Sequence, residues 1–283
     1  MFLNPKKFIL RCMMCSFSFM PVLAMGGAWD RVTQSSHTPP EVIGSPAAGC
    51  VGGAVSLPTV GTGYQVMRLS RNRIYGHPLL IGYIRDLGAA LAAHHLGVML
   101  VGDLGQPRGG PTASLHRSHQ NGLDVDLWYW LPEVAAERRL TTQEIEHLAA
   151  PSVLTQNRRA LNPAHWTATQ VKLLRLAAAP EEVDRIFVHP VIKKSLCNQA
   201  VDRDWLHKIR PWWNHDDHLH VRLSCPPFDS RCVAQKPIPS GDGCGADLDW
   251  WLAAVAAPAP KHRLPPPPAP VLPVACDAVL RAP

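Results

Sequence analysis

The stretch from Asn214 to Cys225, NHDDHLHVRLSC, contains three histidines and two aspartates. Its second half alternates polar and apolar residues. Imidazole and carboxylate groups bind metal ions and carry protons, so this crowding raises the question of a metal site. The alternation predicts a strand over residues 218–224, from which His218 and His220 project on one face. The alternative for a lone H-x-H motif is an exposed pair at a strand end. A metal site therefore requires further ligands elsewhere in the chain.

The segment HRSHQNGLDVD contains the additional side chains that such a site needs, namely His116, His119, Asp124 and Asp126. Catalytic zinc usually takes three protein ligands and leaves a fourth place for water. One histidine and one aspartate from this segment, with one histidine of the H-x-H motif, meet that number. The remaining histidines are then available for proton transfer. Together the two segments predict a metal site built from parts of the chain nearly a hundred residues apart.

Composition and charge narrow the class of protein. Of the 283 residues, 46% are hydrophobic and 18% are charged, as in a globular protein. Residues 1–24 place Lys6, Lys7 and Arg11 ahead of a 13-residue apolar run, which predicts a cleavable signal peptide and is too short to span a bilayer. Its removal lowers the formal net charge from +6 to +3 and leaves no basic run. We therefore expect no membrane span and no nucleic-acid partner.

Six cysteines follow the predicted signal peptide, and their even number suggests three disulfides formed in an oxidising compartment. They are Cys50, Cys197, Cys225, Cys232, Cys244 and Cys276. Six cysteines allow about fifteen pairings, and their spacing does not choose among them.

Apolar periodicity predicts helices and strands in irregular succession rather than in a regular β-α-β order. Helices are expected over residues 78–95, 167–179 and 202–209, the last with Asp202 as its N-cap. Strands are expected over residues 97–105 (leading into a loop), 123–130, 184–190 and 218–224. This mixture predicts one α+β domain over residues 49–255, with a central, mainly antiparallel sheet flanked by helices and long loops. Residues 25–48 are expected to form an irregular arm, and residues 256–283 a Pro-rich extended tail.

The H-x6-D spacing from His119 to Asp126, with the H-x-H motif downstream, resembles the metallopeptidase group of lysostaphin, the D-Ala-D-Ala metallopeptidases and the hedgehog signalling domain. Within that group the chain is similar to the penicillin-insensitive murein endopeptidases from about Gly49 to Trp251. The resemblance rests on five blocks in order: SHQNGLDVD, RIFVHPVIKKSLC, DRDWLHKIRPWW, HVRLSCP and PSGDGCGAD. It implies a disulfide-stapled zinc metallopeptidase domain.

The resemblance also implies which residues bind the metal. His119, Asp126 and His220 match its zinc ligands. His116 matches a histidine of the same loop, for which a part in metal binding is implied. Asp124 faces the same side as Asp126, but the spacing favours Asp126, which leaves Asp124 as a supporting partner.

The remaining histidines receive implied catalytic roles. His218 would accept a proton from a zinc-activated water and pass it to the leaving amine, and His215 would polarise the scissile carbonyl or stabilise the oxyanion. The implied substrate is the peptide cross-link of peptidoglycan, of the D-alanyl–diaminopimelate type. A D,D-carboxypeptidase, an L,D-endopeptidase and a non-catalytic zinc-containing peptidoglycan-binding module are the alternatives. The signal peptide together with the resemblance implies a periplasmic protein.

Three further expectations accompany the resemblance. The implied disulfides are Cys50–Cys276, which would tie back the tail, Cys197–Cys244 and Cys225–Cys232. Some close relatives carry an Asp and a His for a second, interfacial zinc in the segment that reads TQNRRALN here. This chain has Asn157 and no histidine in that segment, so the second zinc site is not carried over. A homodimer is left open. Exposed tryptophans could line a groove for the stem peptide, or could pack in the core: Trp128, Trp130, Trp212 and Trp213.

Overall fold

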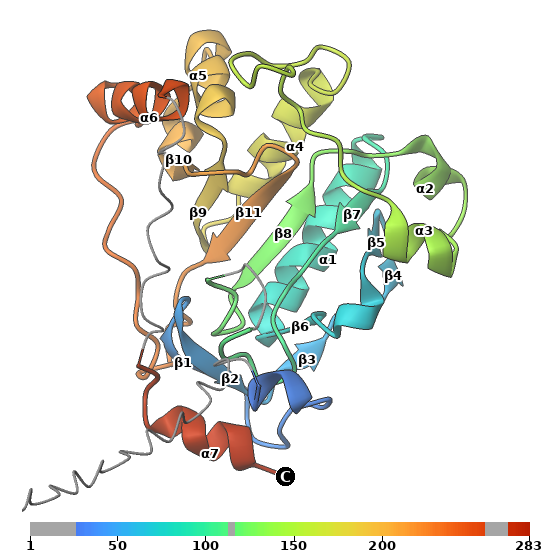
Figure 1. Cartoon of the computed structure of the whole chain (residues 1–283), viewed down its shortest axis with the longest axis vertical. Helices are drawn as coiled ribbons and strands as arrows, with labels where there is room; N and C mark the ends of the chain where they lie inside the picture. The colour runs from blue at the N-terminus through green and yellow to red at the C-terminus, as the bar shows by residue number, and fades with distance from the viewer. Residues whose placement is uncertain (1–26, 113–116, 258–270) are drawn as a thin grey trace, which may run out of the picture.

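A seven-stranded sheet lies at the centre of the computed structural model, which describes residues 27–112, 117–257 and 271–283 (Figure 1). The predicted signal peptide and His116 lie outside these residues. The strand order is β10-β9-β11-β8-β7-β5-β4, and four of the six pairings are antiparallel. The expected α+β fold with a mainly antiparallel sheet is therefore confirmed. The strands are β4 (Val60–Gly61), β5 (Tyr64–Val66), β7 (Met99–Val101), β8 (Asp124–Trp128), β9 (Val183–Val188), β10 (Ile209–Pro211) and β11 (His218–Leu223).

The pairing of β8 with β11 joins the two segments singled out in the sequence. In their antiparallel register, His220 is opposite Asp126, and Arg222 is opposite Asp124. Directly opposed residues project from the same face of a sheet, so these polar side chains share one face. The alternate residues, among them Val125 and Val221, are buried in the main hydrophobic core. The alternation that predicted both strands thus separates a polar face from an apolar one.

Helices α1 (Pro78–Ala93) and α4 (Ala168–Ala178) contact each other and bury apolar side chains in that core. The α1 helix starts where the His77 side chain accepts a hydrogen bond from the Leu79 N–H, with Pro78 at the first helical position. At the start of α4, Thr167 and Gln170 form a capping box. Both helices agree with the periodicity of the sequence within two residues at each end.

Smaller elements surround the sheet. The strands outside it are β1 (Glu41–Ser45), β2 (Ala48–Gly52), β3 (Val55–Ser56) and β6 (Tyr75–Gly76), paired as β1-β2 and β3-β6. The remaining helices are α2 (Glu133–Glu137), α3 (Thr142–His147), α5 (Pro190–Gln199), α6 (Ala246–Ala256) and α7 (Ala275–Arg281). Short 3-10 helices are η1 (Trp29–Arg31), η2 (Leu69–Arg71) and η3 (Asp204–Lys208). Among the described residues, no helix is long and apolar enough to cross a bilayer.

Three local expectations differ from the structure. The arm over residues 25–48 is not wholly irregular, because β1 forms a hairpin with β2 and its Val42 N–H donates to the distant Asp229. In place of the predicted helix over residues 202–209, the structure has the shorter 3-10 helix η3. Its N-cap position is Arg203 rather than the expected Asp202; the Asp202 carboxylate accepts from the Asp204 N–H and pairs with Arg175. Past the prolines, the tail ends in α7, where Cys276 and Val279 are buried.

The three disulfides implied by the resemblance are present. Cys50–Cys276 joins β2 to α7, Cys197–Cys244 joins α5 to the residues before α6, and Cys225–Cys232 closes the loop after β11. The first spans 226 residues of sequence. A bond that closes so long a loop is worth about 5 kcal/mol in the chain-entropy model. It fixes the chain end against the hairpin.

Candidate metal centre and active site

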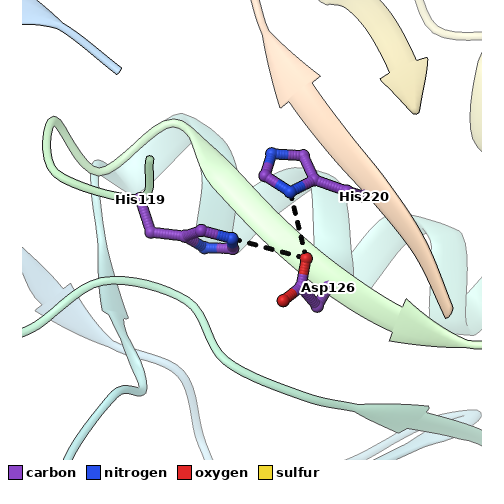
Figure 2. Close-up of side chains that lie close together, drawn as sticks. All are labelled: His119, Asp126 and His220. Carbon is purple, nitrogen blue, oxygen red and sulfur yellow. Dashed lines mark ion pairs between the residues drawn. The ribbon is translucent and has the colours of Figure 1, made fainter. Parts of the chain in front are cut away.

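His119, Asp126 and His220 converge from three parts of the fold (Figure 2). All three are buried, and one ligand atom from each lies within 4.8 Å of the other two. The Asp126 Oδ1 atom is 3.4 Å from Nε2 of His119 and 3.2 Å from Nδ1 of His220. This is the only such group of potential ligands in the described parts of the chain.

Each of these side chains has an identifiable support. Asp126 and His220 occupy opposed positions on β8 and β11, so sheet register fixes their separation. His119 lies in the loop before β8 with a left-handed backbone, φ 67°, which is uncommon for a residue with a side chain. Its N–H donates to Oδ2 of Asp124 at 3.1 Å. The loop therefore holds a conformation that turns the His119 ring toward Asp126, at the cost of local strain.

The geometry of this group fits zinc. Two ligand atoms at about 2.1 Å from a tetrahedral centre lie about 3.4 Å apart. The two distances to Asp126 Oδ1, 3.4 and 3.2 Å, are close to that edge length. Two imidazoles and one carboxylate are also donors that zinc accepts, and three protein ligands are typical of catalytic rather than structural zinc. The residues present can therefore hold such an ion.

Asp124 lies beside the candidate ligands and contacts His220. Arg222 donates from Nε and Nη2 to its two carboxylate oxygens, each at 2.8 Å, and Nε2 of His220 lies 3.3 Å from Oδ2. Burial raises the pKa of Asp124, but Arg222 and then His220 outweigh burial and hold the pKa well below its usual value. An ionised Asp124 favours the proton of His220 on Nε2, which leaves the Nδ1 lone pair directed at Asp126.

His218 lies beside the same carboxylate, with Nε2 3.7 Å from Oδ1 of Asp126. Its Nδ1 is 2.5 Å from Oδ1 of Asp217. Burial lowers the pKa of His218, but Asp126 and Asp217 outweigh burial and raise it to about 9. A cation bound to Asp126 would compensate the charge of that carboxylate and repel a protonated imidazole, so it would bring this pKa down again. Asp217 fixes the ring so that Nε2 faces the centre.

His215 completes the cluster, with its ring centroid 4.9 Å from that of His218. Its Nδ1 is 2.7 Å from the backbone oxygen of Trp213. Because a carbonyl only accepts, Nδ1 carries the proton and Nε2 presents a lone pair while the ring is neutral. Burial, then His220 and His218, lower the pKa of His215 to about 3. A neutral His215 is therefore an acceptor at Nε2; only its protonated form could donate to an oxyanion.

Hydrogen bonds from residues distant in sequence hold the loop that carries His215. Asn214 and His215 both have left-handed backbones, φ 59° and 55°, and the His215 carbonyl accepts from the His189 N–H at 3.0 Å. The neighbouring Asp216 receives both Nη atoms of Arg158, at 3.0 and 2.9 Å. The Ser152 hydroxyl donates to Asp216 as well, at 2.5 Å. These ties anchor the residue next to His215.

Sequence reasoning missed Arg158, Ser152, His189 and the role of Asp217. Only Asp217 carried a signal, because it is the chain neighbour of His218. The others lie far away in sequence and reach the site through tertiary contacts. Of the expected tryptophans, Trp128 is buried with 8% of its surface exposed.

Comparisons with known proteins point to one family along nearly the whole chain. The family described as "Penicillin-insensitive murein endopeptidase" matches residues 42–281. The protein of that name from Yersinia pestis (strain Antiqua) is 42% identical over 270 residues, which cover 95% of each chain. The corresponding Klebsiella pneumoniae (strain 342) protein is 38% identical over 93% of this chain and 96% of its own. The Shigella sonnei protein is 40% identical over 89% and 90%, respectively.

Proposed function

This chain belongs to the penicillin-insensitive murein endopeptidase family, and we propose that it hydrolyses peptide cross-links of peptidoglycan with a zinc ion held by His119, Asp126 and His220. The convergence of these three buried side chains carries the proposal. The adjacent pair of His218 and Asp217 supports a catalytic role over a binding role, because a binding module needs no oriented proton carrier.

A zinc ion at this position would polarise the scissile carbonyl and lower the pKa of a bound water toward about 7. Asp126 is suited to hold it. Burial raises the pKa of its carboxyl, but His119 and His218 outweigh burial and keep the pKa well below its usual value. Asp126 is thus ionised at neutral pH. His220 contributes its Nδ1 lone pair, because Asp124 occupies the other side of the ring.

His218 is the proposed proton carrier. Its Nδ1–H is directed at Asp217, so Nε2 faces the centre, where it accepts the proton of the attacking water and later delivers it to the leaving amine. His215, whose ring centroid lies 4.9 Å from that of His218, accepts a hydrogen bond from a substrate N–H while neutral, or donates one to the oxyanion once protonated. The second role was the one expected from the sequence. His116 stays a proposed additional contributor to metal binding.

The proposed bond is the D-alanyl–diaminopimelate cross-link, and the proposed location is the periplasm after cleavage of the signal peptide over residues 1–24. Three disulfides and a family named for murein support action outside the cytoplasm. Hydrolysis by activated water uses no serine acylated by penicillin, which agrees with the family's insensitivity to that drug.

The decisive experiment combines metal analysis with chromatography of muropeptides after incubation with purified cross-linked dimers. We expect one zinc per chain and release of monomers that stops on chelation and returns with zinc. The position of the new termini identifies the bond, which separates an endopeptidase on the D-alanyl link from an L,D-endopeptidase. Release of only a terminal D-alanine would indicate a carboxypeptidase. Intact dimers with zinc-loaded protein would contradict hydrolysis altogether and leave a binding module.

A further inference from the structure

Four tryptophans form a cluster on the surface near the candidate centre: Trp212, Trp213, Trp250 and Trp251, here called the tryptophan shelf. Trp251 is half-buried at its middle, with ring centroids 5.5, 5.0 and 5.2 Å from those of Trp212, Trp213 and Trp250. The other three expose 47, 43 and 61% of their surface, more than any of the five tryptophans elsewhere. A contiguous exposed aromatic patch on a soluble domain marks an interaction site.

The tryptophan shelf is continuous with the candidate centre. The Trp212 ring is 5.7 Å from that of Phe187, which is opposite His220 in the sheet and 5.3 Å from its ring. The backbone carbonyl of Trp213 holds Nδ1 of His215. Helix α6, which carries the other two tryptophans, lies beside α5 at the same end of the sheet as β10 (Figure 1). A ligand on the shelf would therefore lie next to a substrate at the centre.

The shape and charge of the shelf favour a sugar polymer over a membrane. The ring pairs are inclined by 48 to 85°, so they do not cover one another by stacking. An indole face is electron-rich and attracts weakly positive C–H groups, such as those on one face of a pyranose ring. Asp247 and Asp249 lie in the first turn of α6, and this helix carries no basic residue. An anionic lipid surface gains no attraction from this helix, whereas a sugar ring needs no charge to stack on an indole.

We propose that the tryptophan shelf binds sugar rings of the peptidoglycan glycan strand while the candidate centre takes the peptide cross-link. This inference rests on the proposed function, because in peptidoglycan every stem peptide is attached to a glycan strand. The shelf would concentrate the enzyme on polymer and position the strand beside the scissile bond. Its contribution then disappears when the substrate has no sugar.

The test uses Trp250→Ala, since Trp250 is the most exposed ring of the shelf and touches only Trp251 among the aromatic side chains of the described chain. Two probes separate the two halves of the substrate: glycan strands freed of stem peptides, and sugar-free cross-linked peptide dimers. We expect about tenfold weaker binding of the peptide-free glycan, as for loss of one stacked ring, and unchanged cleavage of the sugar-free dimers. Trp250→Phe, which keeps an aromatic face, should restore part of the affinity.

Phe228→Ala is the matched control, because Phe228 is an exposed aromatic residue in the disulfide loop away from the shelf. It should leave both readouts unchanged. Glycan affinity that is absent in the wild type, or equal in Trp250→Ala and the wild type, would overturn the proposal. So would a loss of vesicle binding or of dimerisation in Trp250→Ala without a loss of glycan binding. Failure of the wild type to cleave sugar-free dimers, with glycan binding intact, would instead count against the proposed hydrolysis.

Discussion

The two sides of the candidate centre are built in different ways. On one side, Asp126 and His220 occupy opposed positions of two central strands, and the buried Asp124–Arg222 pair lies behind them. On the other, His215 lies in a loop and is one of its two left-handed residues, and His218 begins β11 where that loop ends; Asp216 is bound by Arg158, and Asp217 pairs with His218. Sheet register fixes atoms closely, as metal binding requires. A loop and a strand end held by a few polar contacts allow the small changes that a proton carrier makes during a reaction.

The comparison predicts that the two sides fail differently when mutated. Changes among the proposed ligands, which are Asp126 and His220 on the strands and His119 in the loop held by Asp124, should remove the metal together with activity. Changes on the loop side should lower the rate or alter its pH dependence while the metal stays bound.

The largest effect is expected for His119→Ala. It removes one of the three proposed ligands and with it the charge stabilisation that a bound metal would supply, so activity should fall by about 1,000-fold or more. Metal content after dialysis, read by mass spectrometry, should fall well below one ion per chain. His94→Ala changes an exposed histidine outside the cluster and serves as the control. Full metal content in His119→Ala would remove this residue from the ligand set.

His218→Gln tests the loop side directly. The variant keeps a polar side chain but loses the proposed proton carrier, so kcat should fall by about 100-fold or more while one zinc stays bound. Measuring metal content and kcat on the same preparation separates the two properties. If the zinc is lost as well, His218 belongs with the ligands, and the division between the two sides is wrong.

Asp217→Asn changes the electrostatics of His218 without removing its ring. Asp217 helps to raise the pKa of His218, so its neutralisation should lower that pKa. A base acts in its neutral form; hence the acidic limb of the pH profile of kcat should move to lower pH. The maximal rate should drop by about tenfold because the ring loses its orienting partner. An acidic limb that does not move would show that His218 does not set it.

The sequence predicted the strand side better than the loop side, for physical reasons. Period-two alternation placed Asp126 and His220 on the polar faces of two strands, and the structure pairs those strands. Their register, however, depends on the whole sheet. The role of Arg158 was invisible, because its contact with Asp216 spans 58 residues and depends on a loop without periodicity. The left-handed backbone at His119 and Asn214 carried only a weak signal, because Asn and His adopt it more often than most residues but far less often than glycine.

The smallest effect is expected for Arg158→Met, which tests whether remote ties position the loop. The Arg158 side chain is about half exposed, so its ion pair with Asp216 is partly screened, and losing it should lower kcat about fivefold. KM and zinc content should not change, because the variant leaves the ligands and the tryptophan shelf in place. Arg159→Met, at the exposed neighbouring position, is the matched control. Arg158→Lys should recover part of the rate. A fall in thermal stability with unchanged kcat would make the Arg158–Asp216 pair a structural contact, and the loop would then hold His215 through its own backbone and the His189 N–H.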